Sequence, residues 1–399
     1  MSKAKEYKKI IEENQNKCAN PHIGVIIKRR RKDLNMTLED VTKGICCVSY
    51  LSKLEHGTIV PKKYVLNEVL DRLNMKEENL RSKNEYIDII QKCLIEIYYG
   101  NFDVIYEYFE NISDVESIHY TDIIKAIYHL VVGNLNESEK FINKALVVKQ
   151  DFAEEELTAC ILVSALIAEE KHKYKEALDI IKTIEYTYIN NIEVEKLKAI
   201  TLCRIYLMLG MYLSLSNALI IYEDLCMKTI DYGGLVEAKE QFGLSLAYNN
   251  EEKAALNICE LVKRVLDKDS ADDYLKNIYI ALKKPNELLK KCNPKDYEKL
   301  WAYNLLKEKN KCREILEVIR LEDMPDTKTQ LFVQSMMKKY LENEHFYIMF
   351  LKETYYPWVL QHGYYEEAKI LKDIIVDYLI EDSRYKDAIK ILKDFKKMK

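Results

Sequence analysis

The stretch TLEDVTKGICCVSYLSKLEHG, residues 37–57, decides the fold of the N-terminal part of the chain. It begins with Thr37, a good N-cap residue, and Asp40 can act as the acidic capping partner three residues later. A glycine turn follows, and a second helix is predicted from about Val48 to His56. Gly57 ends this helix, because glycine adopts the left-handed conformation freely. The stretch therefore predicts two short helices joined by a tight turn.

The second of these helices has an inward and an outward face. Leu51 and Leu54 lie three residues apart and are predicted to face inward. By position, the outward side chains are those of Cys46, Cys47, Val48, Ser49, Tyr50, Ser52 and Lys53. This arrangement is typical of a helix-turn-helix unit, whose second helix enters the major groove of double-stranded DNA. No outward residue is Arg, Asn or Gln, so we expect hydroxyls, Lys53 and apolar contacts with thymine methyl groups to read the bases, supplemented by the shape of A/T-rich DNA.

Five consecutive basic residues, Lys28–Lys32, lie on the helix predicted to precede this unit, roughly from His22 to Leu34. They form either a solvated surface or a set of phosphate contacts. We favour phosphate contacts, because cations on a helix that crosses the DNA backbone fix the register of docking. The predicted DNA-binding residues are Arg29, Arg30, Thr37, Cys47, Val48, Ser49, Tyr50, Ser52, Lys53 and Lys62.

Residues 23–75 resemble a Cro/C1-type (Xre) DNA-binding domain. The resemblance is carried by IKRRRKDLNMT, GICCVSYLSKLEHG, Pro61 and the helix VLNEVLDRLNM. The GIC turn followed by LSKLEHG is closer to one subset, the RRNPP group of peptide-pheromone regulators of low-GC Gram-positive bacteria, which includes Rgg, NprR, PlcR and PrgX. The chain departs from the family pattern at Leu38, where Gln usually follows the capping residue and touches the DNA.

The composition favours an all-α chain with several domains or a repeat array. The chain has 399 residues but only 10 glycines and 6 prolines, which leaves little room for the turns of a sheet. Its 10 cysteines show no CxxC and no ligand spacing with histidine, so we expect reduced core thiols and no metal or cofactor. A polar N-terminus and the lack of an apolar run of about 20 residues predict a cytoplasmic protein without a membrane segment.

The charge is divided unevenly along the chain. Residues 1–75 carry fifteen Lys and Arg and nine Asp and Glu, a net charge of +6. Because the whole chain has a net charge of −4, residues 76–399 carry −10. We therefore predict a DNA-binding domain over residues 1–75, followed by a separate domain over residues 76–399 that does not meet nucleic acid.

Residues 76–399 contain a recurring phrase of an aliphatic helix, a short turn, an aromatic residue and a second helix. The clearest copies are HKYKEALDII, HGYYEEAKIL and DSRYKDAIKIL, in which Tyr174, Tyr365 and Tyr385 precede Ala177, Ala368 and Ala388 by three residues. The phrase resembles tetratricopeptide repeats, whose period is about 34 residues. We expect eight to nine helix pairs in a right-handed superhelix, with each tyrosine wedged between helices and the first helix of each pair lining a concave wall that suits an extended peptide.

Several polar side chains are predicted to face this wall. Arg204 lies in the aliphatic helix AITLCRIYLMLG, so it needs a carboxylate partner. That partner is either the carboxylate of a bound peptide or an acidic residue of a neighbouring repeat. The predicted peptide-binding residues are Arg204, Glu237, Glu240, Tyr248 and Asn304.

The sequence contains no catalytic constellation that we recognise, and we predict that the protein is not an enzyme. We predict a transcription regulator that binds a palindromic operator as a homodimer and is controlled by a short signalling peptide. The resemblance implies that this peptide is an imported pheromone, and a phage-encoded variant is compatible with it. Two alternatives remain open: a scaffold that acts on a response regulator, as in Rap-type and NprR-type proteins, and an Xre repressor that needs no peptide.

Overall fold

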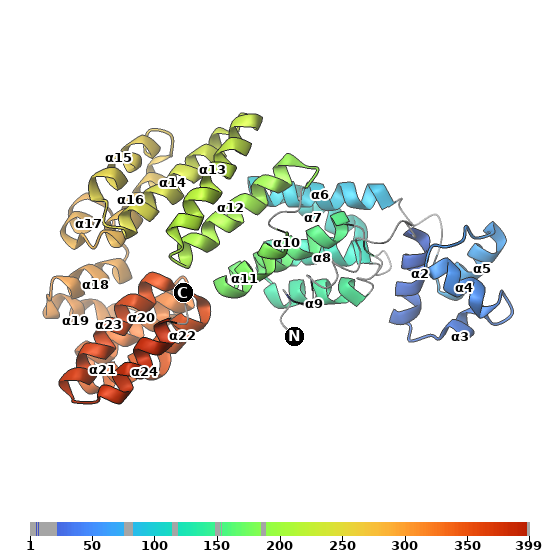
Figure 1. Ribbon diagram of the computed structural model, residues 1–399. Coiled ribbons are helices and arrows are strands. Elements are labelled where there is room, and N and C mark those ends of the chain that lie inside the picture. The colour runs from blue at the N-terminus through green and yellow to red at the C-terminus, as the bar shows by residue number, and fades with distance from the viewer. Residues whose placement is uncertain are drawn as a thin grey trace. The chain divides into compact units, whose positions relative to one another are not determined.

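The computed structural model describes residues 5, 7, 22–75, 83–113, 119–147, 152, 154–184 and 189–396. Within these ranges every regular element is a helix, which confirms the all-α prediction (Figure 1). None of these helices is both long enough and apolar enough to cross a membrane. The chain divides into two compact units, one of Met1–Lys171 with Glu176–Thr201 and the other of His172–Lys175 with Leu202–Lys399.

The first unit begins with a small helical domain, which we call the head. Its helices are α2 (His22–Asp33), α3 (Leu38–Thr42), α4 (Val48–Glu55) and α5 (Lys63–Arg72). Ile26 and Ile27 of α2, Val41 of α3 and Leu51 and Leu54 of α4 form its buried core. The inward positions of Leu51 and Leu54 are as predicted from their spacing. The head is followed in this unit by α6 (Lys83–Tyr99), α7 (Asp103–Ser113), α8 (His119–Val131), α9 (Leu135–Ala145), α10 (Glu154–Glu170) and η3 (Lys182–Ile184).

The boundary between the units crosses two helices. Helix α12 (Ile192–Met208) contributes its first residues to the first unit and its last residues to the second. Helix α11 (Tyr174–Ile181) is divided in the opposite sense, because its first two residues belong to the second unit and the rest to the first. The second unit continues with α13 (Tyr212–Thr229), α14 (Tyr232–Tyr248), α15 (Glu252–Val262), α16 (Lys268–Ala281), α17 (Pro285–Lys291), α18 (Asp296–Leu305), α19 (Lys309–Val318), η4 (Leu321–Asp323), α20 (Thr327–Met337), η5 (Lys338–Glu342), α21 (Glu344–Phe350), η6 (Leu351–Tyr355), α22 (Tyr356–His362), α23 (Tyr365–Glu381) and α24 (Tyr385–Lys396).

Successive helices form hairpins whose turns share one backbone conformation. The first helix of each pair ends at a residue with positive φ; these residues are Gly100, Gly133, His172, Gly210, Asn250, Lys283, Lys307, Gly363 and Ser383. The next amide then donates to a carbonyl five residues back, as Glu251 does to Leu246 at 2.9 Å and Lys284 does to Tyr279 at 2.9 Å. Five of the nine residues are not glycine. The glycine content of the chain therefore does not indicate how many turns of this kind it contains.

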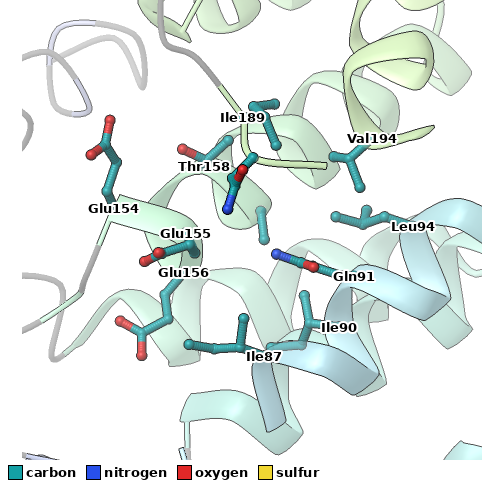
Figure 2. Close-up of a pocket in the computed structure, with 12 residues that line it drawn as sticks. Ile87, Ile90, Gln91, Leu94, Glu154, Glu155, Glu156, Thr158, Ile189 and Val194 are labelled. Carbon is teal, nitrogen blue, oxygen red and sulfur yellow. The ribbon is translucent and has the colours of Figure 1, made fainter. Parts of the chain in front are cut away.

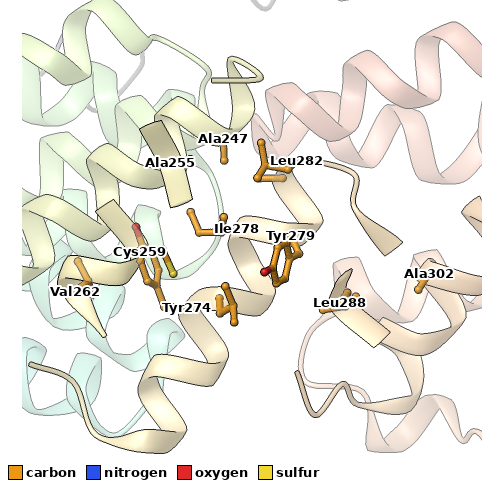
Figure 3. Close-up of a cluster of buried hydrophobic side chains, with 12 residues drawn as sticks. Ala247, Ala255, Cys259, Val262, Tyr274, Ile278, Tyr279, Leu282, Leu288 and Ala302 are labelled. Atoms are coloured by element: carbon orange, nitrogen blue, oxygen red, sulfur yellow. The ribbon is translucent and has the colours of Figure 1, made fainter. Parts of the chain in front are cut away.

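The core of the second unit is built from small residues alternating with large ones. Ala247, Ala255 and Cys259 of α14 and α15 are fully buried against Tyr274 and Ile278 of α16 (Figure 3). Small side chains let neighbouring helices approach closely, and the larger ones fill the space between them. Stacking of this kind is what a helical-repeat protein needs, because no single hairpin can bury its own apolar stripe.

The predicted tyrosine–alanine pairs are only partly as expected. Tyr174, Tyr365 and Tyr385 begin α11, α23 and α24, and the alanines three residues later are all buried. Tyr174 is also buried, as predicted. Tyr385, however, is 59% exposed, so the prediction of a wedge was wrong there. Tyr385 is the first residue of α24, the last helix within the described residues.

Two π-helical segments, η5 and η6, interrupt the pattern between α20 and α22. Segment η6 ends directly before the first turn of α22, which contains a proline. Because proline lacks an amide hydrogen, it removes a helical hydrogen bond, and a wider turn is one way for the backbone to adapt.

Candidate functional site

Helix α4 presents the predicted recognition surface. Thr37 caps α3, its side chain accepts from the Asp40 amide at 3.1 Å, and the Asp40 carboxylate accepts from the Thr37 amide at 2.8 Å, so the predicted capping box is present. Helix α4 then begins after Cys47. Its outward residues form what we call the α4 surface: Cys47, Val48, Ser49 and Lys53 are exposed, and Tyr50 and Ser52 are partly exposed.

Tyr50 has a structural contact as well as an outward position. Its hydroxyl accepts a hydrogen bond of 3.0 Å from the amide of Lys62, the residue that precedes α5. The bond joins the start of α5 to α4. Because the hydroxyl is the acceptor in this bond, its own hydrogen can be donated to another acceptor. Lys62 is exposed beside it, so both predicted residues lie at one edge of the α4 surface.

The structure contradicts the predicted role of Arg29. This side chain is 1% exposed, and its Nη2 donates to Oδ2 of the fully buried Asp122 of α8 at 3.0 Å. Asp33 lies 3.2 Å from its Nε. A guanidinium held in this way has no access to a DNA phosphate. Arg29 instead joins the head to α8 within the first unit.

The neighbouring arginines of the basic run also make contacts inside the head. Arg30 is half-buried, and its Nε donates to the carbonyl of Leu73 at 3.0 Å. Arg31 forms a two-pronged ion pair with Glu55, at 2.6 and 2.8 Å, which joins α2 to α4. Arg30 and Arg31 therefore stabilise the packing of the head. A phosphate contact from Arg30 stays a prediction.

A second group of predicted residues meets in the second unit. Nη1 of Arg204, on α12, donates to Oε1 of Glu237, on α14, at 3.4 Å, and both side chains are 34% exposed. Tyr222 of α13 donates to the other oxygen of Glu237 at 3.3 Å. Of the two partners considered for Arg204, the structure contains the acidic residue of a neighbouring repeat. The ion pair is long, and both side chains are partly exposed.

Helix α14 carries further polar groups near this pair. Burial, together with the charge of Glu237, raises the pKa of Glu240. Gln241 was not among the predicted residues, yet its buried Oε1 has no hydrogen-bond partner. An unsatisfied buried acceptor suits an N–H group of a ligand or a water molecule. Only its position on α14, one residue after Glu240, could have indicated it from the sequence.

Tyr248 and Asn304 belong to two other clusters of the second unit. Tyr248 stacks on Tyr212 with ring centroids 6.5 Å apart, and burial raises its pKa to about 12. Oδ1 of Asn304 accepts from Nζ of Lys339 and from the hydroxyl of Tyr340, each at 2.9 Å. The side-chain carbonyl of Asn304 is therefore hydrogen-bonded within the second unit.

The first unit contains a cavity of about 180 Å³ that sequence reasoning missed. Figure 2 shows Ile87, Ile90 and Gln91 of α6 across from Glu155 and Thr158 of α10. The walls are mostly apolar, and Glu154–Glu156 lie along one edge. Acidic residues are common at the start of a helix, so the sequence did not indicate that these glutamates line a cavity.

The described residues contain no group of three or more His, Cys, Asp or Glu side chains that could hold a metal ion. The cysteines of the described ranges are free thiols, most of them buried. Burial raises the pKa of Cys93 and of Cys203 to about 12, so both stay protonated. Cys93 and Cys203 therefore pack in the core as neutral thiols.

Comparisons with known proteins extend this description. No family model matches the chain. The transcriptional activator NprA of Geobacillus stearothermophilus is 25% identical over 200 residues, which are 45% of this chain and 48% of NprA. The chain thus spans about half the length of the curated relative that it matches.

The solved structures that are similar to the chain include the following two. PlcR of Bacillus thuringiensis, solved with the peptide PapR7 and DNA, is 14% identical over 65% of this chain and 94% of that one, with a TM-score of 0.34. The Rap protein complexed with Competence and Sporulation Factor is 12% identical over 79% of this chain and 98% of that one, with a TM-score of 0.55. The second similarity concerns the fold: the chain has the helical-repeat fold of Rap, a member of the group that its sequence resembles.

Proposed function

We propose that this protein is a DNA-binding transcription regulator whose operator binding is controlled by a short signalling peptide held by the repeat array. The observation that carries the proposal is the α4 surface. Cys47, Val48, Ser49 and Lys53 are exposed on a helix that follows a capped turn, which is where a recognition helix must present its side chains. The similarity to NprA, which is named a transcriptional activator, supports it.

The repeat array supplies a place for the peptide. Arg204 and Glu237 form a long, partly exposed ion pair, so a peptide carboxylate can compete with Glu237 for the guanidinium. Gln241 on the same helix as Glu237 offers an unsatisfied acceptor for a peptide N–H. Glu240, Tyr248 and the amide nitrogen of Asn304 complete the proposed set.

The proposal includes a homodimer in the cytoplasm and no catalytic role. A single head offers few groups for base readout, so two heads on a palindromic operator are needed for specificity. A peptide changes DNA affinity only if it binds one arrangement of the two heads better than another. We place the domain boundary near residue 75, because we assign DNA binding to the head and peptide binding to the repeats.

The proposal is tested by selecting DNA sites from a random duplex library with the full chain. We expect an inverted repeat to be enriched, and we expect peptides encoded beside the gene to change its affinity. Ser49→Glu places a negative charge at the exposed start of α4 and should abolish the enrichment. If no sequence is enriched by the wild-type protein, the head is not a sequence-specific DNA reader.

A second candidate function is a scaffold that acts on a response regulator. The specific observation in its favour is the shared fold with Rap over 98% of that chain. Fold similarity alone does not establish function. The full-length Ser49→Glu variant separates the two, because a scaffold keeps its biological activity when the α4 surface is altered, whereas a DNA-binding regulator loses it.

A further inference from the structure

The cavity of the first unit lies between α6, α10 and the start of α12, and the residues that line it all belong to this unit (Figure 2). Helix α6 contributes residues spaced three or four apart, which therefore share one face of the helix: Ile87, Ile90, Gln91 and Leu94. Ala159 of α10 and Val194 of α12 extend the apolar wall. The cavity therefore suits a ligand with an apolar body.

The volume of the cavity limits the size of this ligand. The volume is about 180 Å³. An apolar cavity of about 150 Å³ in a protein core can bind one benzene molecule, so this one has room for an apolar group of about six carbon atoms and one small polar group. A peptide of several residues is too large for it, so the cavity is separate from the proposed peptide site.

One polar side chain that lines the cavity lacks a hydrogen-bond partner. Thr158 of α10 is 6% exposed, and its hydroxyl has no partner among the described residues. The similarly buried Thr201 of α12, by contrast, donates to the carbonyl of Leu197 at 2.7 Å. A buried hydroxyl without a partner destabilises a fold. Thr158 therefore indicates that the cavity holds a ligand with a polar group.

The charges at the edge of the cavity select the sign of that polar group. Glu154 and Glu155 are exposed there, and neither makes an ion pair within the part of the chain that the structure describes. Tyr120 already donates a hydrogen bond to the third carboxylate, that of Glu156. Among the described residues that line the cavity, none is Lys, Arg or His. The two unpaired carboxylates outweigh the charge of about +0.5 at the N-terminus of α10, so the edge attracts a cation and repels an anion.

We propose that this cavity binds a small primary amine with an apolar body of about six carbon atoms. The body lies among the α6 side chains and Val194, and the ammonium group lies beside Thr158 and Glu155. These two residues are three apart on α10, so they share one face of the helix. An ammonium group has three N–H donors, which the hydroxyl oxygen of Thr158 and the carboxylate of Glu155 can accept. Binding of the amine is measured without DNA or signalling peptide, so the proposal stands or fails separately from the proposed function.

The first experiment is isothermal titration calorimetry of the full chain with three probes that share a six-carbon body: n-hexylamine, 1-hexanol and hexanoate. We expect n-hexylamine to bind with a dissociation constant of about 1 mM or lower, and 1-hexanol to bind at least about tenfold more weakly. Hexanoate should bind more weakly still, because Glu154 and Glu155 repel its charge. Absence of n-hexylamine binding, or equal binding of n-hexylamine and hexanoate, overturns the proposal.

The second experiment shows where the amine binds. Ala159→Met fills the cavity with a flexible apolar side chain, so it should abolish n-hexylamine binding with little change in the melting temperature. Ala165→Met is the matched control: Ala165 is fully buried on the same helix but does not line the cavity, so its substitution should lower the melting temperature by overpacking and leave amine binding intact. If Ala159→Met binds n-hexylamine as tightly as wild type, the amine binds elsewhere and the proposal is wrong.

The third experiment tests the recognition of charge. Glu155→Gln removes one exposed carboxylate from the edge of the cavity, so it should weaken n-hexylamine binding by about fivefold and leave 1-hexanol binding unchanged. Glu107→Gln is the control, because Glu107 is exposed on α7 and does not line the cavity. Equal weakening of the amine and the alcohol would contradict recognition of an ammonium group at Glu155.

Thr158→Val makes predictions of opposite sign for stability and binding. Valine has nearly the same shape but no unsatisfied hydroxyl, so the melting temperature of the ligand-free protein should rise. The same substitution should weaken n-hexylamine binding by about fivefold, because the ammonium group loses one acceptor. A lower melting temperature with unchanged amine binding would show that the hydroxyl has a structural partner, and the proposed position of the ammonium group would be wrong.

Discussion

At the residue scale, the buried ion pair of Arg29 and Asp122 is the contact on which the position of α2 against α8 depends. Both side chains are removed from water, and Lys144 adds a second cation 3.8 Å from Asp122. Such a pair contributes little by itself, but removing one partner leaves the other charge buried without compensation. The pair therefore determines how α2 is positioned against α8, and its net contribution to the free energy of folding is small.

We expect Asp122→Ala to lower the free energy of unfolding of the first unit by about 3 kcal/mol. Urea unfolding followed by circular dichroism measures this loss. Lys140→Ala is the control, because its ion pair with Glu137 is exposed and such pairs contribute about 1 kcal/mol or less. Equal losses from the two substitutions would show that the Arg29–Asp122 contact is not buried in solution.

The raised pKa of Glu240 predicts a dependence of stability on pH. Burial and the charge of Glu237 raise this pKa in the folded state. A carboxyl with a raised folded pKa stabilises the fold below its unfolded pKa, and this contribution is lost as the pH rises through the folded pKa. We expect Glu240→Gln to have a higher melting temperature than wild type at pH 7, with a difference that shrinks toward pH 5. A difference that grows on acidification contradicts the assignment.

Single residues differ in how far the sequence predicts them. The capping box of Thr37 and Asp40 was predicted correctly because both partners lie within one turn. The burial of Arg29 was not, because its partner Asp122 is 93 positions away and nothing near Arg29 indicates it. Local contacts follow from spacing, whereas contacts between distant helices depend on packing.

At the element scale, α2 and α4 approach so closely that only glycine fits between them. A Cβ atom at Gly24 would lie 1.9 Å from the carbonyl oxygen of Leu54, and this neighbour is backbone that cannot move aside cheaply. The position of the α4 surface therefore depends on Gly24, a residue outside that surface.

We expect Gly24→Ala to destabilise the head by at least about 2 kcal/mol and to abolish DNA binding, because overpacking separates α2 from α4. Gly233→Ala is the control: a Cβ there meets only the Asp231 carboxylate, at an ordinary 3.6 Å. Thermal unfolding and a gel retardation assay measure the two effects. Wild-type binding by Gly24→Ala would mean that the α2–α4 contact is looser than the structure has it.

Substitution of Lys62 tests the electrostatic contribution to DNA binding. It is exposed at the edge of the α4 surface, where Tyr50 positions the backbone beside it. We expect Lys62→Ala to weaken binding to all DNA sequences alike and to reduce the slope of log K against log salt by about one for each head. Lys140→Ala again serves as the control and should leave the slope unchanged. A change in the preferred sequence without a change in slope would assign Lys62 to base contacts instead.

Helices were predicted better than the turns between them. The periodicity of apolar residues located α4 and the helix pairs, since burial of one face imposes that period. The residue types at the turns of Lys283, Lys307 and Ser383 gave no local signal, because they are uncommon in the left-handed conformation; at Ser383 only the repeat phrase DSRYKDAIKIL indicated the turn. The exposed ring of Tyr385 shows that the last repeat follows the pattern in sequence but not in packing.

At the scale of the whole molecule, the two compact units do not coincide with the predicted functional domains. The first unit contains the head together with the first repeats, and the boundary falls within α12. The apolar pattern runs through α12 without interruption, so the sequence shows no sign of this boundary. Arg204 and Glu237 lie in the second unit and the α4 surface in the first. The proposed control by a peptide therefore requires coupling between the units.

The most direct measurement of the central claim is the affinity of the full chain for its selected DNA site as a function of salt concentration. If two heads make about six phosphate contacts, log K falls against log salt with a slope of about −5 for the wild-type protein. Ser49→Glu should bind the same site at least about tenfold more weakly. Equal affinities of the two proteins at every salt concentration would contradict the claim that helix α4 reads DNA.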